Sequence, residues 1–484
     1  MISTHCCYPP GRRCSLFFPI SFSLFLTGLF AFPAFSQQRW QRTYGGGNDD
    51  WGSSAQQTSD GGYIVGGWNS FYGSARGKVY LIKTNASGDT LWSRTYGRGI
   101  NDYGNSIQQT SDGGYIIAGS TYYSPTTAYD VYLVKTNPSG DTLWTRIYGG
   151  RSDDYGYSVQ QTSDGGYIVS GTTYSFGAGG YDIYLIKTNG SGDTLWTRTN
   201  GGTNDEEGYS VHQTSDSSFI VAGYTLSFGA GSADAYLLKI NASGDTLWTR
   251  TYGGTKWDEG RSAQQTSDGG YILTGLTFSF DDTLGNVYLV KTDASGDTLW
   301  TRTYGGTGLD NSYSVQQTSD GGYIITGGTY SYGAGTDDVY LIKTDASGDT
   351  LWTRTYGGAS ADRGYSVRQT SDGGYIIAGL TYSFGAGGSD VFLIKTDANG
   401  NVGIEGGQGG KGLRDQGYTV TPNPFTSFAT LPGHEAEGFI LYDISGRRVG
   451  TYPGNRIGPG LSTGIYFLRP ENGSGKTQRI VKLR

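Results

Sequence analysis

The stretch that decides the fold is SGDTLWTR, at residues 139–146. It holds an acid, hydroxyl groups, a tryptophan and an arginine, which are the side chains of a reactive site or of a docking surface. A single active site needs its residues once, whereas this stretch recurs through the chain. Identical copies begin at Ser139, Ser191, Ser243, Ser295 and Ser347, and the copy at Ser87 differs only by Ser93. We therefore interpret the stretch as part of a repeated structural frame.

The repeat that carries this stretch is 52 residues long, and no insertion or deletion breaks its register. Self-similarity at a fixed period is typical of architectures in which each unit buries its apolar faces against its neighbours. The same spacing separates seven tryptophans: Trp40, Trp92, Trp144, Trp196, Trp248, Trp300 and Trp352.

Each repeat is expected to contain four short strands and no helix. In the third repeat, residues 157–162, 167–173, 182–188 and 194–199 have the composition and spacing of strands, separated by turn residues. Asp164-Gly165, between the first two strands, is a hairpin signal because glycine adopts positive φ without steric cost. The third strand is apolar on both faces, which predicts burial between neighbouring sheets.

Four-stranded antiparallel units with this period predict an all-β chain that folds as a β-propeller. The ends favour seven closed blades, because a lone fourth strand at Trp40 can complete the last blade beside the three strands that end near Asp397. A linear solenoid is the alternative, but it would leave a raw edge at each end. We expect the leucine and the tryptophan of SGDTLWTR to fill the interfaces between blades.

The first 36 residues differ in composition from the rest. Two arginines precede an apolar run, and Ala34-Phe35-Ser36 has the small-x-small form of a signal-peptidase site. We therefore expect residues 1–36 to be a signal peptide. The chain's three cysteines lie in this segment, so the mature protein is expected to lack disulfides. The net charge of −7 argues against nucleic acid as a partner, and no integral membrane segment is expected after cleavage.

The repeats are expected to form one domain over residues 37–403, followed by a Gly-rich linker at 404–416 and a separate module at 417–484. That module carries, in order, Tyr418-Thr-Val-Thr-Pro-Asn-Pro-Phe425, the run 440–449, the run 461–468 and a basic end. With these landmarks it resembles the type A C-terminal sorting domain of the type IX secretion system of Bacteroidetes-type bacteria. The resemblance implies a small β-sandwich that is read by the outer-membrane export machinery. It also implies a secreted or outer cell-surface location on a Gram-negative bacterium.

Two short motifs in the repeat resemble known blades. Val131-Tyr-Leu-Val-Lys135 with Ser139–Trp144 is similar to the tryptophan-docking repeat of quinoprotein dehydrogenases, and Gly165–Gly171 is similar to a kelch blade. Both motifs mark blade geometry rather than activity. Quinoprotein enzymes also need metal ligands and a disulfide at the cofactor. Because the mature chain is expected to have no cysteine, the resemblance implies neither an enzymatic role nor a cofactor here.

A ring of acids is the one candidate metal site. It comprises Asp50, Asp102, Asp154, Glu206, Asp258, Asp310 and Asp362, one in each repeat. Seven carboxylates at a channel mouth can hold a cation. The preferred interpretation is structural, with each acid accepting backbone N–H bonds in its loop. His212 stands where five other repeats have glutamine, so it is expected to be inert.

Sequence variation is concentrated in the loops between the fourth and first strands and between the second and third strands, which emerge on one face of a meander. Binding residues are commonly found on such loops. The aromatic residues on this expected binding face are Trp51, Trp68, Phe71, Tyr72, Tyr122, Tyr123 and Trp257. Drift in unselected loops is the alternative explanation.

These observations lead to three functional hypotheses. The first is an exported binding or scaffold module whose partner is a glycan or a surface protein. The second is a secreted hydrolase that acts on polysaccharide, which requires acids or a Tyr–Arg group that breaks the repeat symmetry near the axis. The third is a purely structural surface protein without a ligand.

Overall fold

The computed structural model describes residues 39–70, 77–123, 128–280 and 284–403 of the repeats and, in the tail, residues 426–431, 438–443, 447–453, 456–458, 460–470 and 478–483. The expected signal peptide, the linker, Phe71 and Tyr72 lie outside the described residues. Among the described residues every regular element is a β-strand, as predicted. None of the described segments is a helix with the length and hydropathy needed to cross a bilayer.

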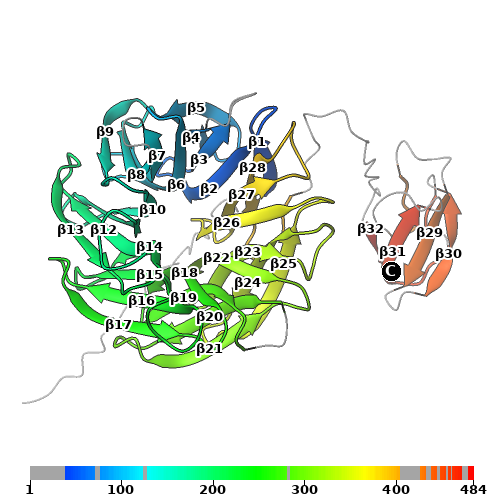
Figure 1. Cartoon of the computed structure of the whole chain (residues 1–484). Helices are drawn as coiled ribbons and strands as arrows, with labels where there is room; N and C mark the ends of the chain where they lie inside the picture. The colour runs from blue at the N-terminus through cyan, green and yellow to red at the C-terminus, as the bar shows by residue number, and fades with distance from the viewer. Residues whose placement is uncertain are drawn as a thin grey trace, which may run out of the picture. The chain divides into compact units, whose positions relative to one another are not determined.

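The repeats form seven four-stranded antiparallel sheets, which Figure 1 shows side by side around a common centre. The prediction of repeated four-stranded blades is therefore confirmed. The first strands are β2 (Asp50–Gln57), β6 (Asn101–Gln109), β10 (Asp154–Gln161), β14 (Glu206–Gln213), β18 (Asp258–Gln265), β22 (Asp310–Gln317) and β26 (Asp362–Gln369). The second strands are β3 (Tyr63–Ser70), β7 (Tyr115–Tyr123), β11 (Tyr167–Thr173), β15 (Phe219–Thr225), β19 (Tyr271–Thr277), β23 (Tyr323–Thr329) and β27 (Tyr375–Thr381). The third strands are β4 (Gly77–Thr84), β8 (Ala128–Thr136), β12 (Asp182–Thr188), β16 (Asp234–Ile240), β20 (Asn286–Thr292), β24 (Asp338–Thr344) and β28 (Asp390–Thr396). The fourth strands are β5 (Thr90–Tyr96), β9 (Thr142–Tyr148), β13 (Thr194–Asn200), β17 (Thr246–Tyr252), β21 (Thr298–Tyr304), β25 (Thr350–Tyr356) and, from the N-terminus, β1 (Trp40–Tyr44).

The turn between the first and second strands is held by its own side chains. In the third repeat, Thr162 Oγ1 donates to Asp164 Oδ1 at 2.5 Å, and the same oxygen accepts the Gly166 N–H at 2.9 Å. Gly165 has φ +81°, where a side chain is disfavoured. The fourth repeat departs from this pattern, because Ser217 holds the equivalent left-handed position with φ 64°.

Replacing Ser217 with glycine is expected to stabilise the protein by about 0.5–1 kcal/mol, since relief of the left-handed conformation outweighs the entropy of the more flexible unfolded chain. The free energy of unfolding from urea denaturation measures this change. The matched control is Gly165→Ser, where a Cβ would meet no atom within 4 Å, so only the backbone conformation is tested. It is expected to destabilise by a similar amount, and equal stability of all three proteins would contradict the account.

The fourth strand of each sheet packs on the turn before the fourth strand of the next sheet. Trp144 meets Tyr167 edge-on, with 5.8 Å between ring centroids. Gly192 approaches the Trp144 indole so closely that a Cβ would stand 2.9 Å from it. The hydroxyl of Tyr148 donates to the Gly192 carbonyl at 2.6 Å. The expected position of the tryptophan at the interface is therefore confirmed.

The rest of SGDTLWTR lies on the outside. Leu143 is 56% exposed, so the expectation that this leucine fills the interface is wrong. The reason is strand alternation, which turns the tryptophan inward and the residue before it outward. Arg146 lies over its own Trp144 ring at 5.5 Å and pairs with Asp193 of the next turn at 3.2 Å.

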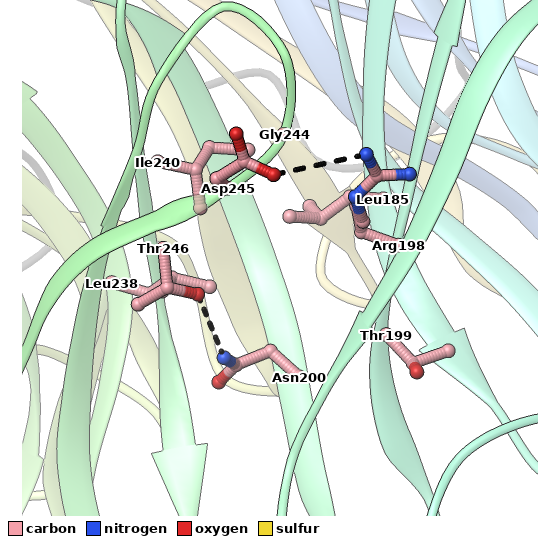
Figure 2. A pocket seen from close by; sticks show the side chains of 9 residues that line it. All are labelled: Leu185, Arg198, Thr199, Asn200, Leu238, Ile240, Gly244, Asp245 and Thr246. Carbon is pink, nitrogen blue, oxygen red and sulfur yellow. Dashed lines mark hydrogen bonds and ion pairs between the residues drawn. The ribbon is translucent and has the colours of Figure 1, made fainter.

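Asn200 interrupts this interface. The other six fourth strands end in a tyrosine whose hydroxyl donates to the glycine carbonyl of the next turn. The smaller Asn200 reaches Thr246 at 3.4 Å and leaves a cavity of about 250 Å³ between β13 and the Gly244 turn, which Figure 2 shows. This pocket is explained by a missing phenol ring and needs no ligand.

Replacing Asn200 with tyrosine is expected to fill this cavity, restore the hydrogen bond to Gly244 and stabilise the protein by about 1–2 kcal/mol. Thermal and urea unfolding measure the gain. Tyr148→Asn makes the reverse change at an intact interface and is expected to destabilise by a similar or larger amount. A destabilising Asn200→Tyr would show that the site cannot accept the ring.

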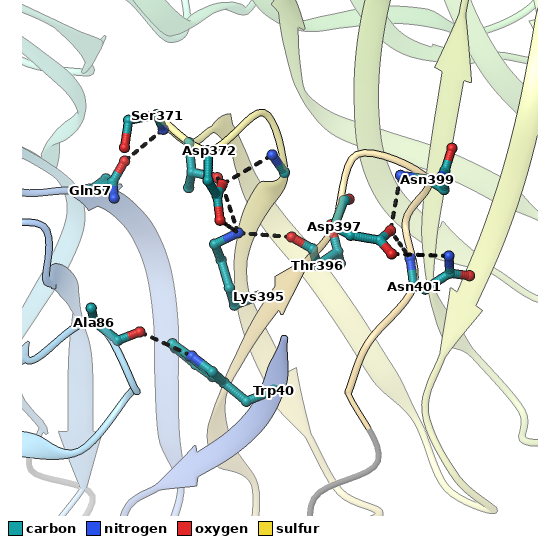
Figure 3. Close-up of polar contacts among 12 residues, drawn as sticks. Trp40, Gln57, Ala86, Ser371, Asp372, Lys395, Thr396, Asp397, Asn399 and Asn401 are labelled. Carbon is teal, nitrogen blue, oxygen red and sulfur yellow. Dashed lines mark hydrogen bonds and ion pairs between the residues drawn. The ribbon is translucent and has the colours of Figure 1, made fainter. Parts of the chain in front are cut away.

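The first and last sheets contact each other as other neighbours do. Strand β1 precedes the first sheet in the chain but belongs to the last sheet, where it pairs along β28 from Trp40 with Lys395 to Tyr44 with Val391. A serine N–H at each first turn donates to a glutamine of the adjacent sheet, and the bond from Ser371 to Gln57 (2.8 Å) joins the last sheet to the first. Figure 3 shows this bond beside the contact from Trp40 Nε1 to the Ala86 carbonyl.

The tail is a second compact unit, with the division between Gly406 and Gly407. Its described residues form one four-stranded sheet in the order β30-β29-β31-β32 and one isolated bridge between Ala429 and Ile457. The strands are β29 (Gly438–Asp443), β30 (Arg448–Pro453), β31 (Gly464–Pro470) and β32 (Gln478–Lys482). Phe439, Leu441 and Leu468 form its buried core.

Candidate functional site

A bulge in the first strand of each sheet positions the candidate site. In the third sheet, Gly156 pairs with Gly171 and Ser158 with Ser170, which leaves Tyr157 without a partner in the ladder. A bulge of this kind re-aims the extra residue's side chain. The bulged residues of the seven sheets are Ser53, Asn105, Tyr157, Tyr209, Arg261, Tyr313 and Tyr365.

All seven bulged residues line one cavity of about 520 Å³, so the cavity lies where the seven first strands converge. Trp51, Trp68 and Tyr103 complete its lining. A volume of this size and a wall of aromatic rings with a few polar groups are typical of small-molecule sites.

The aromatic rings of the cavity touch one another over much of its wall. Trp51 lies 5.2 Å from Trp68 and 6.3 Å from Tyr365, measured between ring centroids. Tyr157 and Tyr209 are 5.3 Å apart, and Tyr313 and Tyr365 are 5.0 Å apart. Trp51 is also held by a hydrogen bond of 2.8 Å to Ser389 Oγ. These contacts restrict the rings and present their faces as fixed surfaces.

Arg261 is the cation among these rings. Its guanidinium lies 4.1 Å from the centroid of Tyr209 and 5.8 Å from that of Tyr313, on the neighbouring sheets to either side. It forms an ion pair with Glu259 at 2.8 Å. Burial raises the pKa of Tyr209 far above its usual range, although the nearby Arg261 opposes this shift. The cavity phenols are therefore neutral hydrogen-bond donors at physiological pH.

A second variable position lies two residues before each bulge. It is aromatic in the first three sheets and polar in the other four, as Trp51, Tyr103, Tyr155, Glu207, Glu259, Asn311 and Arg363. Polar residues at this position interact with the tyrosines of the cavity. Burial and the Glu207 carboxylate raise the pKa of Tyr157, and Asn311 Nδ2 donates to the Tyr313 hydroxyl at 3.2 Å. One side of the site is therefore mainly aromatic and the other carries charge and amide groups.

The residues predicted on the variable face separate into groups. Trp51 and Trp68 line the cavity. Tyr122 contacts Tyr129 at 5.2 Å, and Tyr123 ends strand β7. Trp257 packs 5.4 Å from Tyr224 and lines a different, open pocket with Ser232, Lys256 and Phe278. Of the predicted face residues that the structure describes, Trp51 and Trp68 of the first sheet line the cavity and the other three do not.

The acids of the predicted ring bind their own loops. Asp154 Oδ2 accepts the Gly150 N–H at 2.7 Å, and Glu206 Oε2 accepts the Gly202 N–H at 2.6 Å. Asp102 forms an ion pair with Lys78 at 2.7 Å. Burial and the charge of Asp390 raise the pKa of Asp50 to about 6, while the Gly46 N–H opposes the shift. Within the described residues, no three His, Cys, Asp or Glu side chains are grouped so as to hold a metal ion.

The bulged residues were missed when the sequence was considered alone. Their signal is a variable residue between a small residue and a constant serine, as in Gly156-Tyr157-Ser158 and Gly260-Arg261-Ser262. The sequence variation that indicates binding residues is most evident in the loops, whereas these residues lie inside a strand. Only the bulge, which strand alternation does not predict, makes them face one common space.

Comparisons with known proteins do not place the chain in a family. No family model matches it. The regulatory protein FlaEY of Caulobacter vibrioides is 28% identical over 272 residues, which are 50% of this chain and 27% of that protein. The match thus spans about a quarter of the length of this curated relative.

Similar solved structures include PorZ, described as an essential bacterial surface component of the type IX secretion system of Porphyromonas gingivalis. It has 13% identity and a TM-score of 0.43 over 91% of this chain and 60% of that one. A quinohemoprotein alcohol dehydrogenase of Pseudomonas putida HK5 has 10% identity and a TM-score of 0.42, over 81% of this chain and 79% of that one. Neither likeness is strong enough to define the fold, which is instead seen directly in the order of the sheets.

Removing Arg261 is expected to destabilise the protein by about 2–3 kcal/mol, because Glu259, 8% exposed in its side chain, loses its ion-pair partner. The double variant Glu259→Gln, Arg261→Gln is expected to lose less free energy of unfolding than the sum of the losses of the single variants Glu259→Gln and Arg261→Gln. Urea unfolding of the three variants gives the coupling energy, expected to be at least about 1 kcal/mol. Additive effects would show that the pair is not coupled.

Proposed function

We propose that the protein is an exported, seven-bladed β-propeller that binds a small polyhydroxylated ligand, such as the end of a glycan, in the cavity lined by the bulged residues. The observation that carries the proposal is the convergence of seven bulged side chains, different in kind, within an otherwise repeated frame.

Three observations support a closed ring of seven blades. Strand β1 completes the sheet of β26, β27 and β28. One apolar cluster joins Ala55 and Val65 of the first sheet to Trp40, Ile376 and Val391 of the last. The serine-to-glutamine hydrogen bond occurs at all seven neighbour pairs. A linear solenoid has no means of making the seventh of these contacts.

The composition of the cavity favours a sugar over a flat aromatic or a highly charged ligand. A sugar ring has apolar C–H faces, which pack on tryptophan and tyrosine, and hydroxyl groups around its edge, which need hydrogen-bond partners. Phenols, Asn105 and the ion-paired Arg261 supply donors and acceptors without a large net charge. The cavity's volume suits one or two sugar units rather than a protein surface.

We further propose delivery by the type IX secretion system to the cell surface or the medium of a Gram-negative bacterium. The support is the resemblance of residues 417–484 to a sorting domain, together with the expected signal peptide. The tail's separate core is consistent with a module that is recognised independently of the repeats.

A polysaccharide hydrolase is the second candidate. Glu207, Glu259 and the group of Arg261 with Tyr209 break the repeat symmetry at the axis, which is the feature this hypothesis requires. Glu259 is held in an ion pair by Arg261, whereas Glu207 accepts a hydrogen bond from the neutral Tyr224 hydroxyl at 3.1 Å, so Glu207 is the carboxylate better suited to act on a substrate.

A glycan array followed by calorimetry with the best oligosaccharide tests the binding proposal. Trp68→Ala and Tyr365→Ala are each expected to weaken binding about tenfold or more, because both remove an aromatic wall of the cavity. Tyr382→Ala, an exposed tyrosine outside the cavity, is the matched control and is expected to bind normally.

Three outcomes separate the hypotheses. Binding that survives both cavity variants would contradict the proposed site. Turnover of a polysaccharide that Glu207→Gln abolishes, with binding retained, would establish the hydrolase instead. Absence of any sugar ligand would favour the purely structural role.

A further inference from the structure

A second set of equivalent side chains lies three residues beyond the bulges, toward the other end of the first strands. Its members are Gln56, Gln108, Gln160, His212, Gln264, Gln316 and Arg368. All are half-buried. His212 and Arg368 are among these half-buried residues and keep some surface that solvent can reach. The first strand of each sheet contacts the first strands of both neighbouring sheets. Oε1 of Gln160 accepts the N–H of Gln213, next to His212, and Oε1 of Gln316 accepts the N–H of Gln369, next to Arg368, so members of the set from adjacent sheets lie close together.

The glutamines of this set are oriented by the neighbouring strands. Oε1 of Gln108 accepts the Gln161 N–H, Oε1 of Gln160 accepts the Gln213 N–H, and Oε1 of Gln316 accepts the Gln369 N–H, all at 2.6 Å. Oε1 of Gln56 accepts the Gln109 N–H at 3.2 Å. Only the amide oxygen can accept such a bond, so each amide NH₂ group is left as a donor. Within the described residues these four NH₂ groups have no hydrogen-bond acceptor.

Arg368 adds a permanent positive charge to these donors. Its guanidinium pairs with no carboxylate and donates no hydrogen bond within the part of the chain that the structure describes. Burial disfavours its charge, and no nearby acid offsets this effect. Arginine does not deprotonate in proteins, and partial burial of a cation without a counter-charge is unfavourable. Burial and Arg368 together lower the pKa of His212 to about 3, so the imidazole is neutral and adds no second charge.

We propose that this set of side chains is a binding site for a small anion, held by the Arg368 guanidinium and the amide NH₂ groups of the surrounding glutamines. A chloride ion or a small oxyanion has the chemistry that this donor set recognises, since guanidinium and amide donors bind anions through charge-assisted hydrogen bonds. The bound anion supplies the counter-charge that the protein itself does not provide. The site is distinct from the cavity of the bulged residues and independent of the sugar proposal.

Thermal unfolding of the full chain in sodium chloride, sulfate, phosphate or acetate, each titrated against sodium gluconate at constant ionic strength, tests the proposal. One or more of the four anions is expected to raise the melting temperature in a saturable manner, because ligands that bind only the native state stabilise it. Arg368→Gln restores the residue found in five other repeats, so it is expected to fold. It is also expected to raise the apparent dissociation constant about tenfold or more.

His212→Gln is the matched control, because it makes the same change at the equivalent position without removing a charge. It is expected to keep the saturable response. The relative effects of chloride, sulfate, phosphate and acetate distinguish a halide site from an oxyanion site. Equal responses of the native protein and Arg368→Gln, or no saturable response to any of the four anions, would overturn the proposal. Calorimetric titration with the most effective anion confirms that the response reflects binding.

Discussion

The bulge in the first strand of each sheet is the constraint on which the candidate site depends. A regular strand would direct alternate residues toward neighbouring sheets, and the variable side chains would be dispersed among seven interfaces. By inserting one unpaired residue after Gly156 and its equivalents, the chain sends one side chain per sheet into a common cavity. The small residue before each bulge permits the close approach of the preceding sheet. A Cβ on Gly156 would stand 2.8 Å from the Gly119 carbonyl oxygen.

The sheets that carry these bulges are stabilised by the same few side-chain contacts. Each sheet is closed by a turn whose threonine, aspartate and lysine bind one another, and each interface is sealed by a tryptophan and a tyrosine on the next turn. Because these groups repeat, single departures have local explanations. Ser217 places a side chain in a left-handed turn, and Asn200 leaves a cavity where a phenol ring belongs. Neither departure indicates a function.

Much of the fold follows from the sequence because its signals are local and repeated. The 52-residue register, the Asp-Gly turns and the doubly apolar third strand predict four-stranded blades without reference to tertiary contacts. The role of Leu143 was predicted wrongly, because an apolar residue on an outer strand can remain in solvent. Of the residues that line the candidate cavity, Trp51 and Trp68 are the two that the sequence indicated as binding residues. Tyr157, Tyr209 and Arg261 line one cavity because a bulge changes the direction of each side chain and because the sheets converge. Neither effect can be predicted from the sequence of a single repeat.

A crystal structure of the full chain with a bound oligosaccharide is the most direct test of the proposal that the bulged residues form a ligand site. We expect a sugar ring packed against Trp51, Trp68 or a cavity tyrosine, with its hydroxyl groups hydrogen-bonded to bulged residues. A sugar bound instead on the outer strands or on the pocket of Trp257, with the axial cavity empty, would contradict it.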